Sequence, residues 1–264
     1  MNKRFFPFAL AVLSMPMLAA AQSQFEGTWK VDLSTANFPK KPTVFLLQNG
    51  MYECKSCIPP IAVKADGTDQ PVSGQPYYDS VAIKVVNDHG IEETDKKSGE
   101  VVTTSTSTVS PDGKTMSFTF NDGSNTNGGP PVTGKGESTL VAKGPAGSHA
   151  ISGSWRITKI EGVSDNGTVW TYKVSGDEIT MTTLTGQSYT ARLDGTDAPE
   201  KGDPGITSVS LKMIGKNTLE ETDKRDGKVI SVSRMTVSSD GKTARIVGED
   251  KLQNTTSTIT ATKQ

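Results

Sequence analysis

The sequence has few of the side chains that carry most enzyme chemistry. Its 264 residues include two cysteines and two histidines, and neither His89 nor His149 lies in a nucleophile motif. The chain has no Gly-x-Ser-x-Gly, no phosphate-binding Gly-x-x-x-x-Gly-Lys-Ser/Thr loop and no His-Glu-x-x-His sequence. A structural zinc site needs four ligands, and the histidines are far from the cysteines in the chain. We therefore do not expect an enzyme, and we expect no cofactor and no metal.

Hydrophobic residues are also scarce. They make up 33% of the chain, and aromatic residues make up 6%, which is low for an ordinary globular domain. Beyond the N-terminal segment no stretch is apolar enough to cross a bilayer, which takes about 20 residues, so we expect no membrane span. The formal net charge is −1. This balance supplies no basic field, so we do not expect nucleic acid as a partner.

The N-terminal segment has the layout of a secretory signal peptide. Lys3 and Arg4 form a basic start, Phe5 to Leu18 form an apolar run, and Ala19 to Ala21 supply small residues for cleavage. The apolar run is short for a membrane anchor, which is the alternative interpretation. We assign residues 1–21 to the signal peptide and expect cleavage near Ala21. The mature protein is then expected to be periplasmic or secreted.

The two halves of the chain repeat each other. One segment of the first half returns 128 positions later, and a Gly-x-Trp segment returns after 126 positions. A repeat of this length indicates an internal duplication, with two copies of one structural unit. The matched segments are 91–99 with 219–227, 109–115 with 237–243, and 27–30 with 153–156.

Both copies read as β-strands. Apolar side chains alternate with polar ones in several runs, which is the period of half-buried strands. Asn-Gly and Asp-Gly pairs between the runs favour tight turns. A count of roughly eight or nine strands per half is consistent with a small closed barrel. The clearest alternating sets are Val81, Ile83 and Val85; Val209, Leu211 and Met213; Met116, Phe118 and Phe120; and Trp170, Tyr172 and Val174.

We predict an all-β fold of two tandem antiparallel barrels or half-barrels, with little or no helix outside the signal peptide. The first unit spans residues 25–143 and the second spans 151–264. The join between them, 144–149, is short and leaves little freedom, so we expect the units to pack against each other. The sequence leaves open whether they form separate barrels or one composite barrel.

The start of each unit resembles the first strand of lipocalin-like (calycin) barrels. Gly27 and Trp29, and Gly153 and Trp155 in the second copy, match the Gly-x-Trp of that superfamily. The resemblance implies that each indole lies across one end of a barrel. A large ring is suited to closing such an end, and glycine allows a neighbouring strand to come close.

A wider pattern resembles a group of uncharacterised exported bacterial proteins. Its carriers are the segments 64–72 and 109–115. This resemblance covers most of the mature chain. It implies export from the cytoplasm, and it brings no known activity with it.

The only cysteine pair, Cys54 and Cys57, predicts a structural disulfide, because exported proteins enter an oxidising compartment. A redox-active Cys-x-x-Cys would open a helix in a βαβ unit, whereas this pair follows an alternating run. Haem attachment would need histidine at the position of Ile58. Redox and metal roles are the alternatives. The second copy has Met181 and Leu184 near the equivalent position, so the unit does not require the bridge.

Two acidic patterns invite a catalytic or metal-binding interpretation. In the repeated Glu-Glu-Thr-Asp stretch, Glu92 and Glu93 point to opposite faces of a strand and cannot form a dyad together, so we interpret the stretch as a solvated hairpin edge. The segments 66–69 and 194–197 lack the distal bidentate glutamate of a calcium loop, and we interpret them as turns. We interpret the oxygen-rich segment 121–129 as a mobile loop.

These features favour a binding protein over an enzyme. Our first hypothesis is an exported protein that holds a small apolar or amphipathic ligand, since a small barrel can enclose one when side chains do not fill its interior. The alternative is a structural or interaction protein of the cell envelope with no ligand cavity. The sequence identifies neither the ligand-binding residues nor any protein partner.

Overall fold

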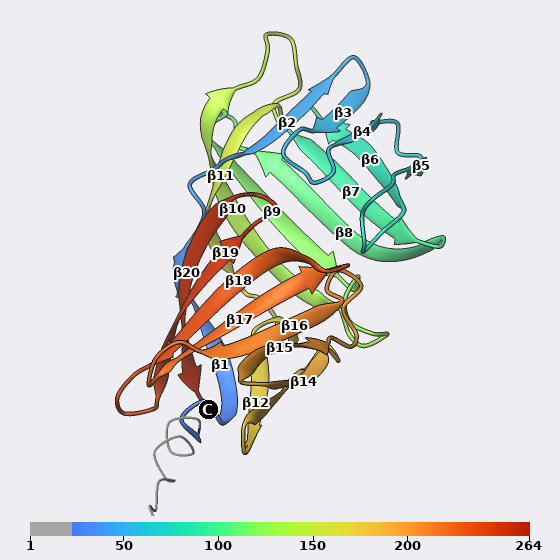
Figure 1. The fold of residues 1–264 in the computed structure, drawn as a ribbon. Helices are drawn as coiled ribbons and strands as arrows, with labels where there is room; N and C mark the ends of the chain where they lie inside the picture. The colour runs from blue at the N-terminus through green and yellow to red at the C-terminus, as the bar shows by residue number, and fades with distance from the viewer. Residues whose placement is uncertain (1–22) are drawn as a thin grey trace, which may run out of the picture.

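Strands account for nearly all the regular structure of the protein (Figure 1). The computed structural model describes residues 23–264, in which twenty β-strands are joined by turns and one short 3-10 helix, η1 (Asp165–Gly167). The predicted all-β fold is therefore confirmed. Each half has ten strands rather than roughly eight or nine, because strands as short as Gln70–Pro71 leave no alternating pattern. The predicted signal peptide, residues 1–21, lies outside the described residues.

The strands form two ten-stranded antiparallel sheets, each curled into a nearly closed barrel. The first barrel has the order β4-β3-β2-β11-β10-β9-β8-β7-β6-β5, and the second has the order β14-β13-β12-β1-β20-β19-β18-β17-β16-β15. The strands of the first barrel are β2 (Thr43–Gln48), β3 (Met51–Cys54), β4 (Ile61–Lys64), β5 (Gln70–Pro71), β6 (Ser80–Asn87), β7 (Gly90–Lys97), β8 (Glu100–Val109), β9 (Thr115–Asp122), β10 (Val132–Lys143) and β11 (Gly153–Glu161). The strands of the second barrel are β1 (Gly27–Asn37), β12 (Val169–Ser175), β13 (Glu178–Thr183), β14 (Ser188–Arg192), β15 (Asp194–Pro199), β16 (Ser208–Met213), β17 (Thr218–Arg225), β18 (Lys228–Val237), β19 (Thr243–Asp250) and β20 (Thr255–Lys263).

The first strand of each half lies in the barrel of the other half (Figure 1). β1 pairs with β12 and β20, and it carries Trp29 into the second barrel. β11 pairs with β2 and β10, and it carries Trp155 into the first barrel. The boundaries 25–143 and 151–264 thus describe the sequence duplication, whereas the sheets divide the chain after β1 and after β11. Two exchanged strands interlock the barrels.

Each sheet comes close to closing because a backbone bridge joins its two ends. In the first barrel Asp66, which follows β4, bridges to Lys84 on β6. In the second barrel Ser188 on β14 and Lys201, which follows β15, exchange two backbone hydrogen bonds of 2.9 Å. These bridges shorten the exposed strand edges, and exposed edges otherwise promote aggregation.

Trp29 and Trp155 have matching environments in the two barrels. Their side chains are 0% and 1% exposed. Each indole N–H donates to the backbone carbonyl four residues earlier, Phe25 or Ile151, at 2.8 Å. The duplication is therefore preserved in the cores as well as in the sequence.

The glycines of the two Gly-x-Trp segments are required by the backbone. Gly27 and Gly153 have φ angles of +125° and +146°, which side chains rarely tolerate. A Cβ atom at Gly153 would also lie 2.7 Å from the carbonyl oxygen of Ala142 on the neighbouring strand. The predicted close approach of a neighbouring strand is therefore present at this glycine.

Each barrel encloses its own apolar core. The alternating pattern correctly predicted the core faces of β6 and β16, where Val81, Ile83, Val209 and Leu211 are at most 1% exposed. Val85 continues the same face but is 42% exposed near the end of β6. The second core also takes in Tyr172, Ile179, Tyr189, Leu219 and Val237, and the first takes in Tyr52, Val63, Ile91, Val109 and Met116.

Candidate functional site

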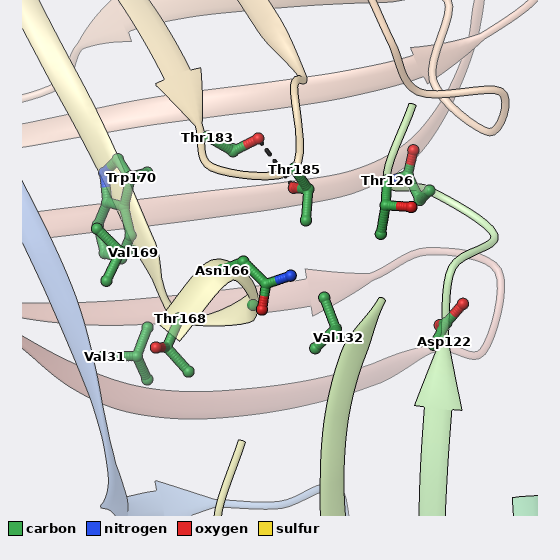
Figure 2. Close-up of a pocket in the computed structure, with 12 residues that line it drawn as sticks. Val31, Asp122, Thr126, Val132, Asn166, Thr168, Val169, Trp170, Thr183 and Thr185 are labelled. Atoms are coloured by element: carbon green, nitrogen blue, oxygen red, sulfur yellow. Dashed lines mark hydrogen bonds between the residues drawn. The ribbon is translucent and has the colours of Figure 1, made fainter. Parts of the chain in front are cut away.

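A pocket of about 230 Å³ lies between one end of the second barrel and a loop of the first (Figure 2). Its lining comes from β1, from the end of β9 and the loop after it, from the start of β10, from η1 and β12, and from the end of β13 and the turn after it. Both apolar and polar side chains contribute. They include Val31, Val132, Val169, Trp170, Asn125 and Thr183.

The crossing from β11 to β12 forms one side of this pocket and is tied to the first barrel. The Ser164 hydroxyl accepts from the Thr133 amide at 3.0 Å and donates to Asn166 Oδ1 at 2.6 Å. Asn166 Nδ2 in turn donates to the carbonyl of Pro130 at 2.9 Å. These bonds hold η1 against the start of β10, so the pocket wall is positioned by two sheets rather than by a free loop.

The loop 123–131 covers the pocket and is fastened to the second barrel. Asn125 Nδ2 donates to Asp203 Oδ2 at 2.8 Å, and Asn127 Nδ2 donates to the carbonyls of Thr185 and Gly202 at 3.0 and 3.1 Å. Tyr77 of the first barrel also donates to Asp203, at 3.0 Å. The segment interpreted as a mobile loop is therefore hydrogen-bonded across the contact between the barrels. These bonds agree with the expectation, based on the short join, that the two units pack against each other.

Two buried polar atoms at this pocket have no hydrogen-bond partner among residues 23–264. They are the indole nitrogen of Trp170, a donor, and the amide oxygen of Asn125, an acceptor. A buried polar group left without a partner costs about 1–3 kcal/mol. Val31, Val132 and Val169 beside them are apolar.

The duplication has produced a second pocket, of about 260 Å³, from the corresponding segments. Thr43 occupies the position that corresponds to Trp170. Thr43 pairs with Trp155 on β11, as Trp170 pairs with Trp29 on β1. The side-chain amide of Gln253, from the β19–β20 loop, donates to the Ser56 carbonyl at 2.8 Å, and the backbone carbonyl of Gln253 accepts from Lys41 at 2.9 Å. This second pocket therefore lacks the free indole donor.

The repeated Glu-Glu-Thr-Asp stretch is not a solvated edge on both faces. Glu92 points outward to Lys84, at 3.0 Å. Glu93 lies opposite Ile83 and Asp95 lies opposite Val81, and both partners belong to the buried core. Because directly paired residues share a sheet face, Glu93 and Asp95 form an inward-facing carboxylate pair. The i, i+2 spacing of Glu93 and Asp95 could have predicted this pair from the sequence. Only Glu92 and Glu93 were compared at the level of sequence, and they point to opposite faces.

The second barrel has the same inward pair, Glu221 and Asp223, opposite Leu211 and Val209. Burial raises the pKa of Glu93 and of Glu221 to about 7. Burial, with Glu93 and Asp122 nearby, raises the pKa of Asp95 to about 8. Burial also raises the pKa of Glu200 to about 8, and Glu221 adds to this effect. These carboxyl groups therefore titrate near neutral pH, far above ordinary surface acids.

Cys54 and Cys57 form the disulfide, and Cys57 lines the second pocket. By strand register Cys54 corresponds to Met181. Cys54 pairs with Phe45 in the first barrel, and Met181 pairs with Tyr172 at the equivalent position of the second barrel. The bond fastens a local turn that the second barrel forms without it. No group of three or more metal-ligating side chains that could hold a metal is found within residues 23–264.

Replacing Cys54 and Cys57 by serine is expected to lower the free energy of unfolding by about 1–2 kcal/mol at most, because the closed loop is very short. Urea denaturation of the double variant, compared with disulfide-bonded wild-type protein without reductant, measures this effect. A variant without a cooperative unfolding transition would show that the bridge has a larger role.

The remaining predicted site residues take structural roles. Asp66 accepts from the amide of Thr68 at 3.0 Å, and Asp194 accepts from the amide of Thr196 at 2.9 Å, so both aspartates are occupied in turns. His149 lies 2.6 Å from the carbonyl of Asn87. None of these residues lines the pocket of Figure 2.

The fold and the pocket define the class of this protein as a duplicated, nearly closed antiparallel β-barrel protein with a small cleft between the barrels. No protein-family model and no curated protein matches the sequence. The lipocalin-like resemblance therefore stays a prediction. Within the described residues, none of the helical segments has the length and apolar character needed to span a membrane.

Proposed function

We propose that the protein binds one small amphipathic ligand in the pocket beside Trp170. The observation that carries this proposal is that two residues lining one cleft each have a buried polar atom with no partner among the described residues, the indole N–H of Trp170 and the amide oxygen of Asn125. Ligand sites commonly combine apolar walls with a few placed polar groups. This pocket has that composition, whereas its duplicate has Thr43 at the place of Trp170, and the indole N–H of Trp155 there donates to the Ile151 carbonyl.

The size of the pocket restricts the ligand. Its volume of about 230 Å³ lies below the range of about 300–1,000 Å³ typical of drug-sized ligands. A long fatty acid or a large ring system does not fit in it. A compact molecule with an oxygen acceptor and an N–H or O–H donor matches the free atoms.

We also propose that the protein acts outside the cytoplasm. The N-terminal pattern of residues 1–21 and the Cys54–Cys57 disulfide support this location. The mass of the protein isolated from the periplasm or medium of its own cells tests it. A mature N-terminus near Gln22 is expected, and a full-length cytoplasmic protein would contradict export.

Native mass spectrometry of protein purified from its own cells tests the binding function. We expect a co-purifying mass at one per chain, lost in Trp170→Phe, which removes the indole N–H and keeps a ring. Thr43→Val is the matched control at the equivalent position of the second pocket, and it should retain the mass. Ligand-free wild-type protein, or a mass that survives Trp170→Phe unchanged, would contradict the proposal.

The alternative function is that of a structural or interaction protein of the cell envelope. The observation in its favour is that large side chains such as Trp29, Trp155 and Phe25 are fully buried in the barrel cores. Under this alternative the cleft serves only to join the two barrels. Ligand-free protein in the preceding experiment would favour this function.

A further inference from the structure

The inward carboxylate pairs of the two barrels have different surroundings. In the second barrel Glu221 accepts a hydrogen bond from the Tyr189 hydroxyl, and Asp223 accepts one from the Ser231 hydroxyl. Glu221 and Asp223 therefore each have one donor supplied by the protein, while Asp223 Oδ1 and Glu200 Oε2 have no partner among the described residues. Such donors offset the free energy that burial of an acid requires.

The first barrel lacks both donors. Strand register places Ile61 where the second barrel has Tyr189. The residue equivalent to Ser231 is Thr103, which donates to Asp122 at 3.1 Å instead of to Asp95. As a result Asp95, although only 7% exposed, keeps a buried oxygen, Oδ1, with no partner among the described residues.

The groups around this pair are acids and phenols. Tyr52 on β3, Tyr78 before β6, Glu93 on β7 and Asp122 on β9 are the titratable groups that act electrostatically with Asp95. None of them carries a positive charge. A cation placed among them would gain from every neighbour, and a buried charge of this kind needs such a partner.

We propose that the interior of the first barrel binds an organic cation through its ammonium group, held by Asp95 and Glu93. An ammonium has three N–H donors, which supply the hydrogen bonds that Ile61 and Thr103 do not provide. Tyr52 and Tyr78 offer aromatic surface for the apolar part of the ligand. Glu93 and Tyr78 are half-buried residues. Asp95, Glu93, Tyr52 and Tyr78 do not line the pocket beside Trp170, whereas Asp122 lines that pocket as well.

Affinity for the cation should rise with pH. The carboxyl groups must be ionised to hold an ammonium, and both have a pKa near neutrality, about 7 for Glu93 and about 8 for Asp95. Binding should therefore be weak at pH 5.5 and strong at pH 8.5, while the amine remains charged up to about pH 10.

Calorimetric titration of the full chain with butylammonium tests the proposal, with 1-butanol as the neutral probe. We expect one site per chain for butylammonium at pH 8.5 and none for butanol. Asp95→Asn should weaken the affinity by about tenfold or more, because it removes a charge-assisted bond. Asp223→Asn is the matched control in the second barrel, and Trp170→Phe is the control for the other pocket; both should bind as wild type.

Several results would overturn this inference. One is the absence of butylammonium binding by wild-type protein, which would mean that Glu93 and Asp95 share a proton and need no ligand. Another is equal binding by wild type and by an Asp95→Asn variant whose circular dichroism spectrum shows the native fold. If Asp95→Asn does not fold, loss of binding in Glu93→Gln supports the site and unchanged binding there overturns it. Loss of binding in Trp170→Phe would place the cation in the other pocket.

Discussion

A chain that begins at Pro39, and so lacks β1, is expected to lose the folded second barrel. β1 lies in the middle of that sheet, between β12 and β20, and its removal leaves two unpaired edges. It also removes Phe25 and Trp29, both 0% exposed. Loss of two large buried aromatic side chains costs more than about 6 kcal/mol. This is comparable with the total stability of a domain, about 5–15 kcal/mol.

Moving the strand to the other end of the chain provides the control. The permuted chain starts at Pro39, runs to Gln264, and continues through a copy of the loop 144–152 into residues 25–38. The first barrel already uses this loop to join β10 to β11, and β20 and β1 have the equivalent relationship. The permuted chain is therefore expected to recover the near-ultraviolet circular dichroism of wild type.

Separate fragments distinguish the two ways of dividing the chain. Fragment 39–161 contains all ten strands of the first barrel, whereas fragment 25–143 lacks β11 and carries the unpaired β1. We expect cooperative unfolding for the first fragment and none for the second. The opposite result would show that the strands are not exchanged.

The free energy of unfolding is expected to fall as the pH rises from about 4.5 to about 8. The pKa of Glu93 is raised from 4.5 to about 7 on folding, and that of Asp95 from 3.8 to about 8. Between its unfolded and folded pKa values, each carboxyl group binds more protons in the folded state than in the unfolded state. Its contribution to the free energy of unfolding is therefore fully present below the unfolded pKa and is lost as the pH rises through the folded pKa. For Glu93 the loss is about 3 kcal/mol, at about 1.4 kcal/mol per pKa unit.

Urea denaturation at pH 5, 7 and 8.5 measures this profile, and substitution of single glutamates assigns it. Glu93→Gln cannot ionise, so it should flatten the decline between pH 5 and 8.5. Glu92→Gln changes the neighbouring residue on the outer face, where Lys84 pairs with it, and should keep the wild-type slope. A stability that increases through this range, or equal slopes for both variants, would contradict the inward placement of Glu93.

The sequence was sufficient to predict the fold class, because period-two alternation and duplicated turns act locally. It was not sufficient to predict the strand exchange. The two copies offer nearly the same partners to a Gly-x-Trp strand, so the pattern around Trp29 fits either barrel equally well. Only the three-dimensional path of the segments after β1 and β11 decides which barrel each strand enters.

The candidate sites were missed for two different physical reasons. Asn125 and Trp170 line the same pocket because loop 123–131 crosses to the other barrel. No local sequence pattern indicates such a crossing. Glu93 and Asp95 do have one, the i, i+2 spacing on a strand. Charged residues are rarely buried, however, and this general expectation favoured the solvated interpretation.

The indole N–H resonances of the three tryptophans test the central claim, that a ligand is held at the pocket between the barrels. Trp29 and Trp155 donate to backbone carbonyls in the cores and serve as internal references, whereas the buried N–H of Trp170 has no partner in the part of the chain that the structure describes. In ¹H–¹⁵N spectra, protein purified from its own cells is compared with the same protein after unfolding, dialysis and refolding. The account predicts that the Trp170 signal shifts and that the other two stay in place. Three unchanged signals, or a shift confined to Trp29 or Trp155, would contradict it.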